Sequence, residues 1–216
     1  MTHDDFGNRI RSGDLDGVRR ALLSDESLAS RPIRWFLNQQ NESDPLHYIA
    51  DCVGQGWLTN GTEGELARLM IEHGASINGS GDRETPLIGA ASMGVERVAS
   101  VLIEAGADLE RTSVFGARAL HWAAWMGNAA TVGLMVSRGA ALEARCSQYG
   151  ATPLFWAVHG FGPGGPCPKG DQVGAARILL DAGARVQTTN SHGQSAIELS
   201  GLCGSDAMYE LLLRSA

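Results

Sequence analysis

From residue 44 onward, apolar positions recur as short runs that share one pattern. The first residues of successive runs are separated by 41, 33, 34 and 43 residues. A period near 33 residues is the sequence mark of a repeat architecture, and the two longer steps contain about eight and ten additional residues. The aligned runs are DPLHYIADC (44–52), TPLIGAASMG (85–94), RALHWAAWMG (118–127), TPLFWAVHG (152–160) and SAIELSGLCG (195–204).

Each run predicts a short helix, and a second helix is predicted after each of the first four. In two runs Thr precedes Pro, which suits an N-cap followed by the first helical position. In the second stretches, a spacing such as Val98, Val101 and Leu102 places apolar residues on one helical face. Each of these stretches ends in Gly-Ala, and the Gly suits a left-handed helix terminus. The second stretches are 65–75, 95–107, 129–140 and 175–184.

The T-P-L-H-x-A pattern and the period near 33 residues resemble the ankyrin-repeat family over about residues 44–214. The resemblance implies about five to six repeats. Of the 17 basic residues 16 are Arg, which suggests a bacterial-type member. The implied fold is all-α, an ankyrin-repeat solenoid of stacked helix-turn-helix units with short β-turn-like connections. We expect a single domain, 1–216, with an N-terminal capping repeat and linker at 1–43, four internal repeats at 44–194 and a C-terminal capping repeat at 195–216.

The signature histidine of the family is present in only some of the runs. His47 and His121 match it, and we interpret both as structural. Ile88, Phe155 and Glu198 stand in its place elsewhere, so the hydrogen bonds that this histidine makes between neighbouring repeats are not expected there.

The resemblance also implies that the short helices line a concave face, which binds partners through helix positions and through the preceding turns. Trp122 and Trp125 are then predicted to face outward beside Trp156. The small Gly89 and Ser92 lie nearby, so that large residues next to small ones form an aromatic pit. Exposed aromatic surface of this kind marks binding sites, although Trp122 and Trp156 suit packing equally well. The predicted binding residues are Tyr48, Asp51, Ser92, Met93, Phe115, Trp122, Trp125, Met126, Tyr149, Trp156 and His159, and the turns add Asp82, Glu84 and His192.

Two insertions fall between the short and long helices of their repeats. They cover residues 54–64 and 160–170, and the second is rich in Gly and Pro. We expect them to wall the groove without clearly closing it. Surface loops of this length are also tolerated without any role. Trp57 favours a role for the first insertion, because an exposed Trp at a loop tip needs a contact.

Charge and cysteine usage exclude several classes of partner. The net charge of −7 argues against nucleic-acid binding, which depends on neutralised phosphates. Cys52, Cys146, Cys167 and Cys203 lie far apart without a C-x-x-C pair, so no metal site is expected. No apolar run is long enough for a membrane span, and the N-terminus does not resemble a secretory signal. A cytoplasmic monomer without a cofactor is predicted.

Catalytic motifs are missing from the sequence, and an enzymatic role is not favoured. Neither a phosphate-binding loop nor a nucleophile elbow is present. His159 and Asp51 are the only candidates for an acid and a base, and three repeats separate them. His159 has Tyr149 or His192 as more plausible neighbours.

Two functions therefore stay open. In the first, the protein is an interaction module that binds another protein in the concave groove, and an acidic surface would suit a basic or amphipathic partner. In the second, it binds a small apolar or cationic ligand in the aromatic pit, or shapes a cyclisation as a biosynthetic enzyme.

Overall fold

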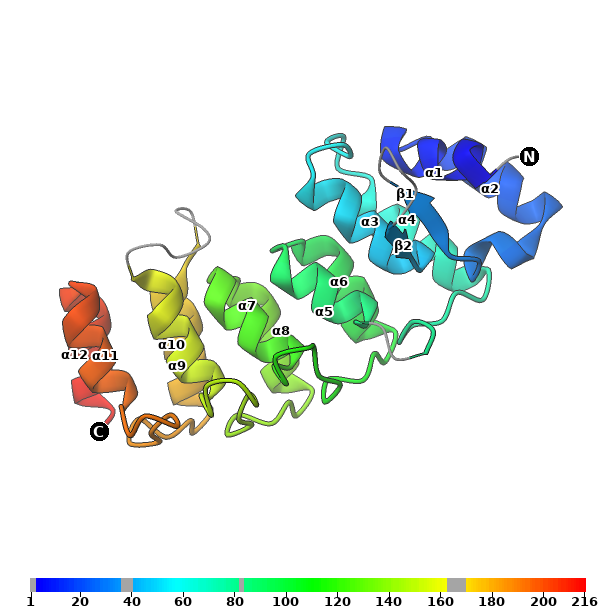
Figure 1. Ribbon diagram of the computed structural model, residues 1–216. Coiled ribbons are helices and arrows are strands. Elements are labelled where there is room, and N and C mark those ends of the chain that lie inside the picture. The colour runs from blue at the N-terminus through cyan, green and yellow to red at the C-terminus, as the bar shows by residue number, and fades with distance from the viewer. Residues whose placement is uncertain (1–2, 36–40, 82–83, 163–169) are drawn as a thin grey trace. The chain divides into compact units, whose positions relative to one another are not determined.

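The computed structural model describes residues 3–35, 41–81, 84–162 and 170–216 (Figure 1). The chain forms two compact units, unit 1 (Met1–Asp108) and unit 2 (Leu109–Ala216). Within the described residues there are twelve α-helices, one short 3-10 helix and one two-stranded sheet. None of these helices has the length and apolar character that a membrane crossing would require.

Unit 1 consists of successive helix pairs with a small hairpin between the first and the second. Helix α1 packs on α3 and α3 on α5, while α2 packs on α4 and α4 on α6, so each helix meets its counterpart in the next pair. The elements are α1 (His3–Ser12), α2 (Leu15–Ser24), η1 (Glu26–Ala29), β1 (Ile33–Trp35), β2 (Asn41–Ser43), α3 (Pro45–Gly54), α4 (Glu63–Glu72), α5 (Pro86–Ser92) and α6 (Glu96–Glu104).

Unit 2 repeats this arrangement with three pairs. Helix α9 lies between α7 and α11, and α10 lies between α8 and α12. Each pair leaves an apolar face that only a neighbouring pair can cover. The helices are α7 (Ala119–Met126), α8 (Ala129–Ser137), α9 (Pro153–Phe161), α10 (Gln172–Asp181), α11 (Ala196–Cys203) and α12 (Asp206–Arg214).

The helix boundaries follow the predicted signals. The Thr85 hydroxyl accepts a hydrogen bond from the Ile88 N–H at 3.2 Å, and Thr152 caps α9 in the same way at 3.4 Å. Gly106 follows α6 with φ of 88°, and Gly139 follows α8 with φ of 82°, in the left-handed region where a Cβ is strained. The predicted N-caps and glycine termini are confirmed at these helices.

The hairpin of unit 1 departs from the all-α expectation. Ile33 pairs with Ser43 and Trp35 with Asn41 in an antiparallel ladder. The Trp35 Nε1–H donates a hydrogen bond of 2.9 Å to Ser43 Oγ. Residues 33–35 alternate between buried and exposed positions and include two good strand formers. The segment predicted as a linker before residue 44 thus contains a hairpin, which the sequence did not reveal because three-residue strands are too short to show a period.

Side chains in the turns tie each helix pair to the next. In unit 2, Glu110 Oε1 accepts the Ala141 N–H at 3.1 Å, and Glu143 Oε1 accepts the Arg185 N–H at 2.8 Å. Asn78 makes the equivalent bond in unit 1. These three side chains occupy equivalent places in successive pairs, so the turns set the stacking register together with the helices.

Leu102 tests which face of α6 is packed. Its side chain is fully buried in unit 1, whereas Leu23 on α2 is 70% exposed. Leu102→Ala is expected to lower the free energy of unfolding by about 2–5 kcal/mol through lost burial and a cavity. Leu23→Ala is the matched control, with a change within about 0.5 kcal/mol. Urea unfolding followed by circular dichroism measures both, and equal effects would contradict the assigned facing of the helix.

Candidate functional site

Unit 2 contains a pocket with a volume of about 380 Å³. It lies between the first helices of the three pairs and the turns that precede them. Aromatic rings, imidazoles and side-chain amides dominate its lining. The lining residues are Phe115, Trp122, Trp125, Gln148, Tyr149, Ala151, Phe155, Trp156, His159, Asn190, His192, Gln194 and Leu199.

Three indoles form the back wall of the pocket, and we call Trp122, Trp125 and Trp156 the indole cluster. The ring centroids lie 5.6 Å apart for Trp122 and Trp125, 5.0 Å for Trp122 and Trp156, and 6.4 Å for Trp125 and Trp156. The interplanar angles of 73–78° are those of edge-to-face contacts, which stabilise aromatic pairs beyond the burial of their area. Two helices, α7 and α9, therefore build one aromatic surface.

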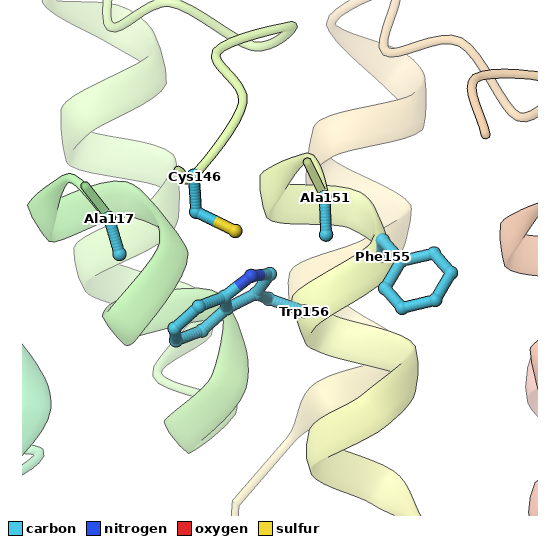
Figure 2. Packing of buried hydrophobic residues seen from close by; sticks show 5 residues of the cluster. All are labelled: Ala117, Cys146, Ala151, Phe155 and Trp156. Carbon is cyan, nitrogen blue, oxygen red and sulfur yellow. The ribbon is translucent and has the colours of Figure 1, made fainter. Parts of the chain in front are cut away.

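The three indoles differ in burial. Trp156 is only 8% exposed, whereas Trp122 and Trp125 are half-buried and pack against it. Figure 2 shows the Trp156 ring reaching from α9 toward Ala117 and Cys146. Trp156 thus belongs to the core and to the pocket wall at once, and the α7 indoles offer more of their surface to the pocket.

The front of the pocket is formed by turn tips at equivalent positions. Phe115 and Tyr149 are 38% and 46% exposed, and each directly precedes a glycine with positive φ. His192 occupies the same place in the following turn. The Phe115 carbonyl accepts the Ser147 N–H, and the Tyr149 carbonyl accepts the Ser191 N–H, each at 2.9 Å. Backbone bonds between neighbouring turns therefore hold the aromatic tips in register.

Gly160 permits the close approach of α9 to α7 beside the indole cluster. A Cβ at this position would lie 2.1 Å from the Trp125 carbonyl oxygen, so any other residue would force the helices apart. The side-chain amide of Gln172 donates to the same carbonyl at 3.3 Å. The spacing between the α7 and α9 indoles depends on this contact.

His121 is fully buried and packs against Trp156 of the pocket wall. Its Nδ1 accepts the Arg118 N–H at 3.1 Å, which leaves the proton on Nε2. Nε2 lies 3.1 Å from the Ala144 carbonyl and 3.2 Å from that of Ala151, and donates to both. The ring also contacts the Trp156 indole edge-to-face at 5.6 Å. The structural role predicted for His121 is confirmed, and burial lowers the pKa of its imidazole to about 4.

The structure brings together seven of the predicted contact residues, His192 of the turns among them, and the others do not line the pocket. Phe115, Trp122, Trp125, Tyr149, Trp156 and His159 all line the pocket. Sequence reasoning missed Phe155, which takes the signature histidine's place. It also missed the amides of Gln148, Asn190 and Gln194. Their position in the turns beside Tyr149 and His192 was the available signal.

Tyr48 and Asp51 were predicted on an open face, and that prediction is wrong. Tyr48 is fully buried and its hydroxyl accepts from Arg11 Nε. Asp51 is 3% exposed, and its Oδ2 accepts the Ser43 hydroxyl at 2.7 Å while Oδ1 lies 3.6 Å from His47 Nε2. Burial raises the pKa of Asp51, and His47 acts in the opposite direction. Helix α1 and the hairpin cover this face of α3, and neither was expected to do so.

Ser92, Met93 and Met126 also do not line the pocket. The Ser92 hydroxyl donates to the Gly89 carbonyl at 3.0 Å, and both methionines are half-buried. The space expected at Gly89 is filled, because a Cβ there would lie 2.8 Å from the His47 ring. The pit was predicted where large residues meet small ones. The observed pocket is instead lined by residues between 115 and 199 of unit 2.

The first insertion stays within unit 1. Trp57 is 38% exposed, its ring lies edge-to-face on Trp35 at 5.7 Å, and the Arg11 guanidinium carbon is 4.6 Å from its centroid. The contact that an exposed Trp needs is thus supplied by its own unit, and no residue of 54–64 lines the pocket.

Only the ends of the second insertion belong to the described residues. Gly160 and Gly170 pack against the Trp125 and Met126 carbonyls. Residues 163–169, with Cys167 and Lys169, lie outside the described residues, as does Asp82 of the predicted turn contacts.

The pocket does not hold the acid–base pair that was considered. His159 shares it with Tyr149 and His192, while Asp51 is in the core of unit 1. Among the lining residues that belong to the described ranges there is no Asp, Glu, Lys or Arg. Within the described part of the chain, no three His, Cys, Asp or Glu side chains converge as metal ligands would.

Charge is distributed unevenly along the chain. Residues 1–108 contain seventeen Asp or Glu and nine Lys or Arg, whereas residues 109–216 contain seven and eight. The net negative charge therefore belongs to unit 1, and unit 2, which contains the pocket, is close to neutral.

Comparison with known proteins shows a local similarity. No protein-family model matches the chain. A segment of 76 residues is 38% identical to Neurogenic locus notch homolog protein 1 of Xenopus tropicalis. This segment is 35% of the chain and spans only 3% of that protein, so the similarity is confined to a small part of it.

His121 provides a test of the core beneath the pocket. Its folded pKa of about 4 lies below the value of about 6.5 in an unfolded chain, so the unfolded state binds the proton first as pH falls. The free energy of unfolding is expected to drop by about 3 kcal/mol as the pH falls from about 6.5 to about 4. Urea titrations of the parent protein and of His121→Gln isolate the contribution of His121, because only the parent is expected to show this drop in the free energy of unfolding. A His121 imidazole that titrates near pH 6.5 by NMR would contradict the assignment.

Proposed function

We propose that this chain is an ankyrin-repeat protein that binds a partner protein through the pocket of unit 2. The paired helices with Thr-Pro starts and the stacking within each unit support the family assignment. So does the local similarity to a Notch homologue, since Notch 1 contains ankyrin repeats. In this proposal the chain is one solenoid domain with capping repeats at both ends.

The observation that carries the proposal is the aromatic lining of a pocket that stands open to solvent at its turn tips. Phe115 and Tyr149 keep more than a third of their surface exposed, and Trp122 and Trp125 are half-buried beside them. Aromatic residues with this mixture of rigidity and exposure dominate the binding energy of protein interfaces.

In this proposal, the aromatic rings contact apolar side chains of the partner and the side-chain amides contact its main chain. An apolar side chain of the partner packs on the indole cluster and removes its surface from water. The amides of Gln148, Asn190 and Gln194 lie in the turns at the front of the pocket. They exchange hydrogen bonds with the partner's main chain and set its register.

A small-molecule ligand is the second candidate. The volume of about 380 Å³ falls within the range of small-molecule sites, and an apolar lining with a few polar groups is typical of them. In this alternative, His159, His192 and Tyr149 orient the ligand. A biosynthetic role would add a cyclisation shaped by the aromatic wall.

Trp125→Ala tests the partner-binding proposal. Random peptides displayed on phage are selected on the parent protein and then measured against single variants. Peptides bound at the pocket are expected to lose at least about tenfold in affinity on Trp125→Ala, as an interface anchor does. Trp57→Ala, which removes an exposed indole from unit 1, is the matched control and leaves binding unchanged. Circular dichroism checks that both variants melt close to the parent.

The competing outcomes separate the two candidates. Saturable quenching of tryptophan fluorescence by a compound from a metabolite library, with no peptide selected, would favour the small-molecule site and contradict partner binding. Peptides that bind Trp125→Ala as well as the parent would place the interface elsewhere.

A further inference from the structure

We infer that two copies of this chain associate through the outer face of helices α11 and α12 in unit 2 (Figure 1). The outer face is the surface formed by Ile197 and Gly201 on α11 and by Tyr209 and Leu213 on α12. Helix α9 packs against α11 and α10 against α12, and the outer face is the side that these two helices leave accessible. The inference is independent of the proposed function and departs from the predicted monomer.

Tyr209 is exposed at a position where the earlier pairs bury a smaller residue. In α4, α6, α8 and α10 this position is fully buried, and the residues there are Ala67, Ala99, Val132 and Ala176. Tyr209 is 40% exposed, although Met208 and Leu212 beside it are fully buried. Leu213 lies one helical turn after Tyr209 on the same face and is 49% exposed. Helix α12 therefore projects an aromatic ring and a leucine side chain into solvent.

Gly201 leaves a hollow on α11. In the earlier short helices the sixth residue after the N-cap is fully buried, and these residues are Ala50, Ala91, Ala124 and Val158. Gly201 has this position on α11 but is exposed, and a Cβ there would contact nothing within 4 Å in the described chain. Glycine inside a helix is unfavourable relative to alanine. Since unit 2 itself has room for a side chain here, the glycine suits the close approach of a group from outside the chain.

The outer face lacks the polar character of a capping repeat. A capping repeat needs a polar outer surface to stay soluble, whereas none of the four residues of the outer face is charged. Ile197 is half-buried, while Leu120 and Leu154 at the equivalent position are buried. Glu210 and Arg214 on α12 form an ion pair with each other at 3.1 Å, so they need no counter-charge from a partner. An exposed apolar surface of this kind is typical of an interaction site.

The projection on α12 and the hollow on α11 favour a second copy of this chain as the occupant. A further pair stacked in the regular way places its second helix on α12 and its first on α11, as α10 and α9 do. Its second helix then meets the Tyr209 ring, while the hollow at Gly201 stays unfilled and loses dispersion contacts. In a second copy related by a two-fold axis parallel to the helices, α12 of one copy lies on α11 of the other. Tyr209 of each copy then fills the hollow of the other, and the contact is isologous and closed.

Gly201 and Tyr209 also lie at similar levels along the helices. The tight turn at Gly204 and Ser205 joins α11 to α12. Gly201 lies three residues before Gly204, and Tyr209 lies four residues after Ser205. At about 1.5 Å per residue, these separations correspond to heights of about 4–6 Å above the turn. Rotation about an axis parallel to the helices preserves the heights, so the ring of one copy arrives opposite the glycine of the other.

Sedimentation equilibrium of the full chain tests the inference. Loading concentrations from about 1 μM to about 1 mM cover weak and ordinary complexes. Over this range the mass is expected to rise toward twice the 22.8 kDa of one chain. Leu213→Arg places a charge in the interface and is expected to weaken dimerisation by at least about tenfold. Leu23→Arg, at an exposed leucine of unit 1, is the matched control and leaves the dimer unchanged.

Gly201→Leu and Tyr209→Ala separate complementary shape from mere apolarity. Gly201→Leu enlarges the apolar surface but fills the hollow, so it is expected to weaken dimerisation by at least about tenfold. Tyr209→Ala removes the projecting ring and is expected to weaken dimerisation by a similar factor. The double variant moves the projection to α11 and the hollow to α12, so it is expected to dimerise more tightly than either single variant. Circular dichroism checks that the variants fold, as the exposure of both positions implies.

Several results would overturn the inference. A chain that stays monomeric over the whole concentration range does so, as does a dimer that Leu213→Arg leaves intact, since the interface is then elsewhere. Tighter association of Gly201→Leu would show an unspecific apolar contact, and a double variant no tighter than the single ones would exclude the pairing of α11 with α12. The proposed function is judged separately, because peptides selected on the pocket are expected to bind Leu213→Arg as they bind the parent.

Discussion

The burial of one helix pair by the next is the constraint on which this structure depends. A single pair leaves an apolar face uncovered, and no described helix is longer than ten residues, so isolated pairs would not be stable. Stacking also positions every side chain that matters here. Gly160 lets α9 approach α7 closely, and the Glu143 carboxylate connects its turn with that of Arg185. The pocket is a product of this stacking, since no single pair contains it.

Local chemistry explains why much of the fold could be predicted from the sequence. Several features act within or beside their own repeat, so the neighbouring sequence is enough to predict them. They are the caps at Thr85 and Thr152, the helix-ending Gly106 and the buried His121. The hairpin before residue 44 could not be predicted, because its strands are too short for a periodic signal.

The site was predicted in part, and the failures have one cause. We assumed that residues at equivalent positions of different repeats are surrounded by the same neighbouring elements. This holds for Trp125 and Tyr149, whose neighbours are ordinary pairs. It fails for Tyr48 and Asp51, because α1 and the hairpin bury them. Phe155 was missed for a related reason, since replacing the signature histidine frees a core position to serve as pocket wall.

The net negative charge of the chain lies in unit 1, and this bears on how fast a partner can arrive. Long-range attraction raises association rates only when opposite charges face each other across solvent. The near-neutral residues 109–216 exert little such attraction on any partner. Encounter at the aromatic turns is then governed by diffusion and orientation, at about 10⁵–10⁶ M⁻¹s⁻¹, and is nearly indifferent to ionic strength. Selectivity among competing segments would reside in how long each one stays.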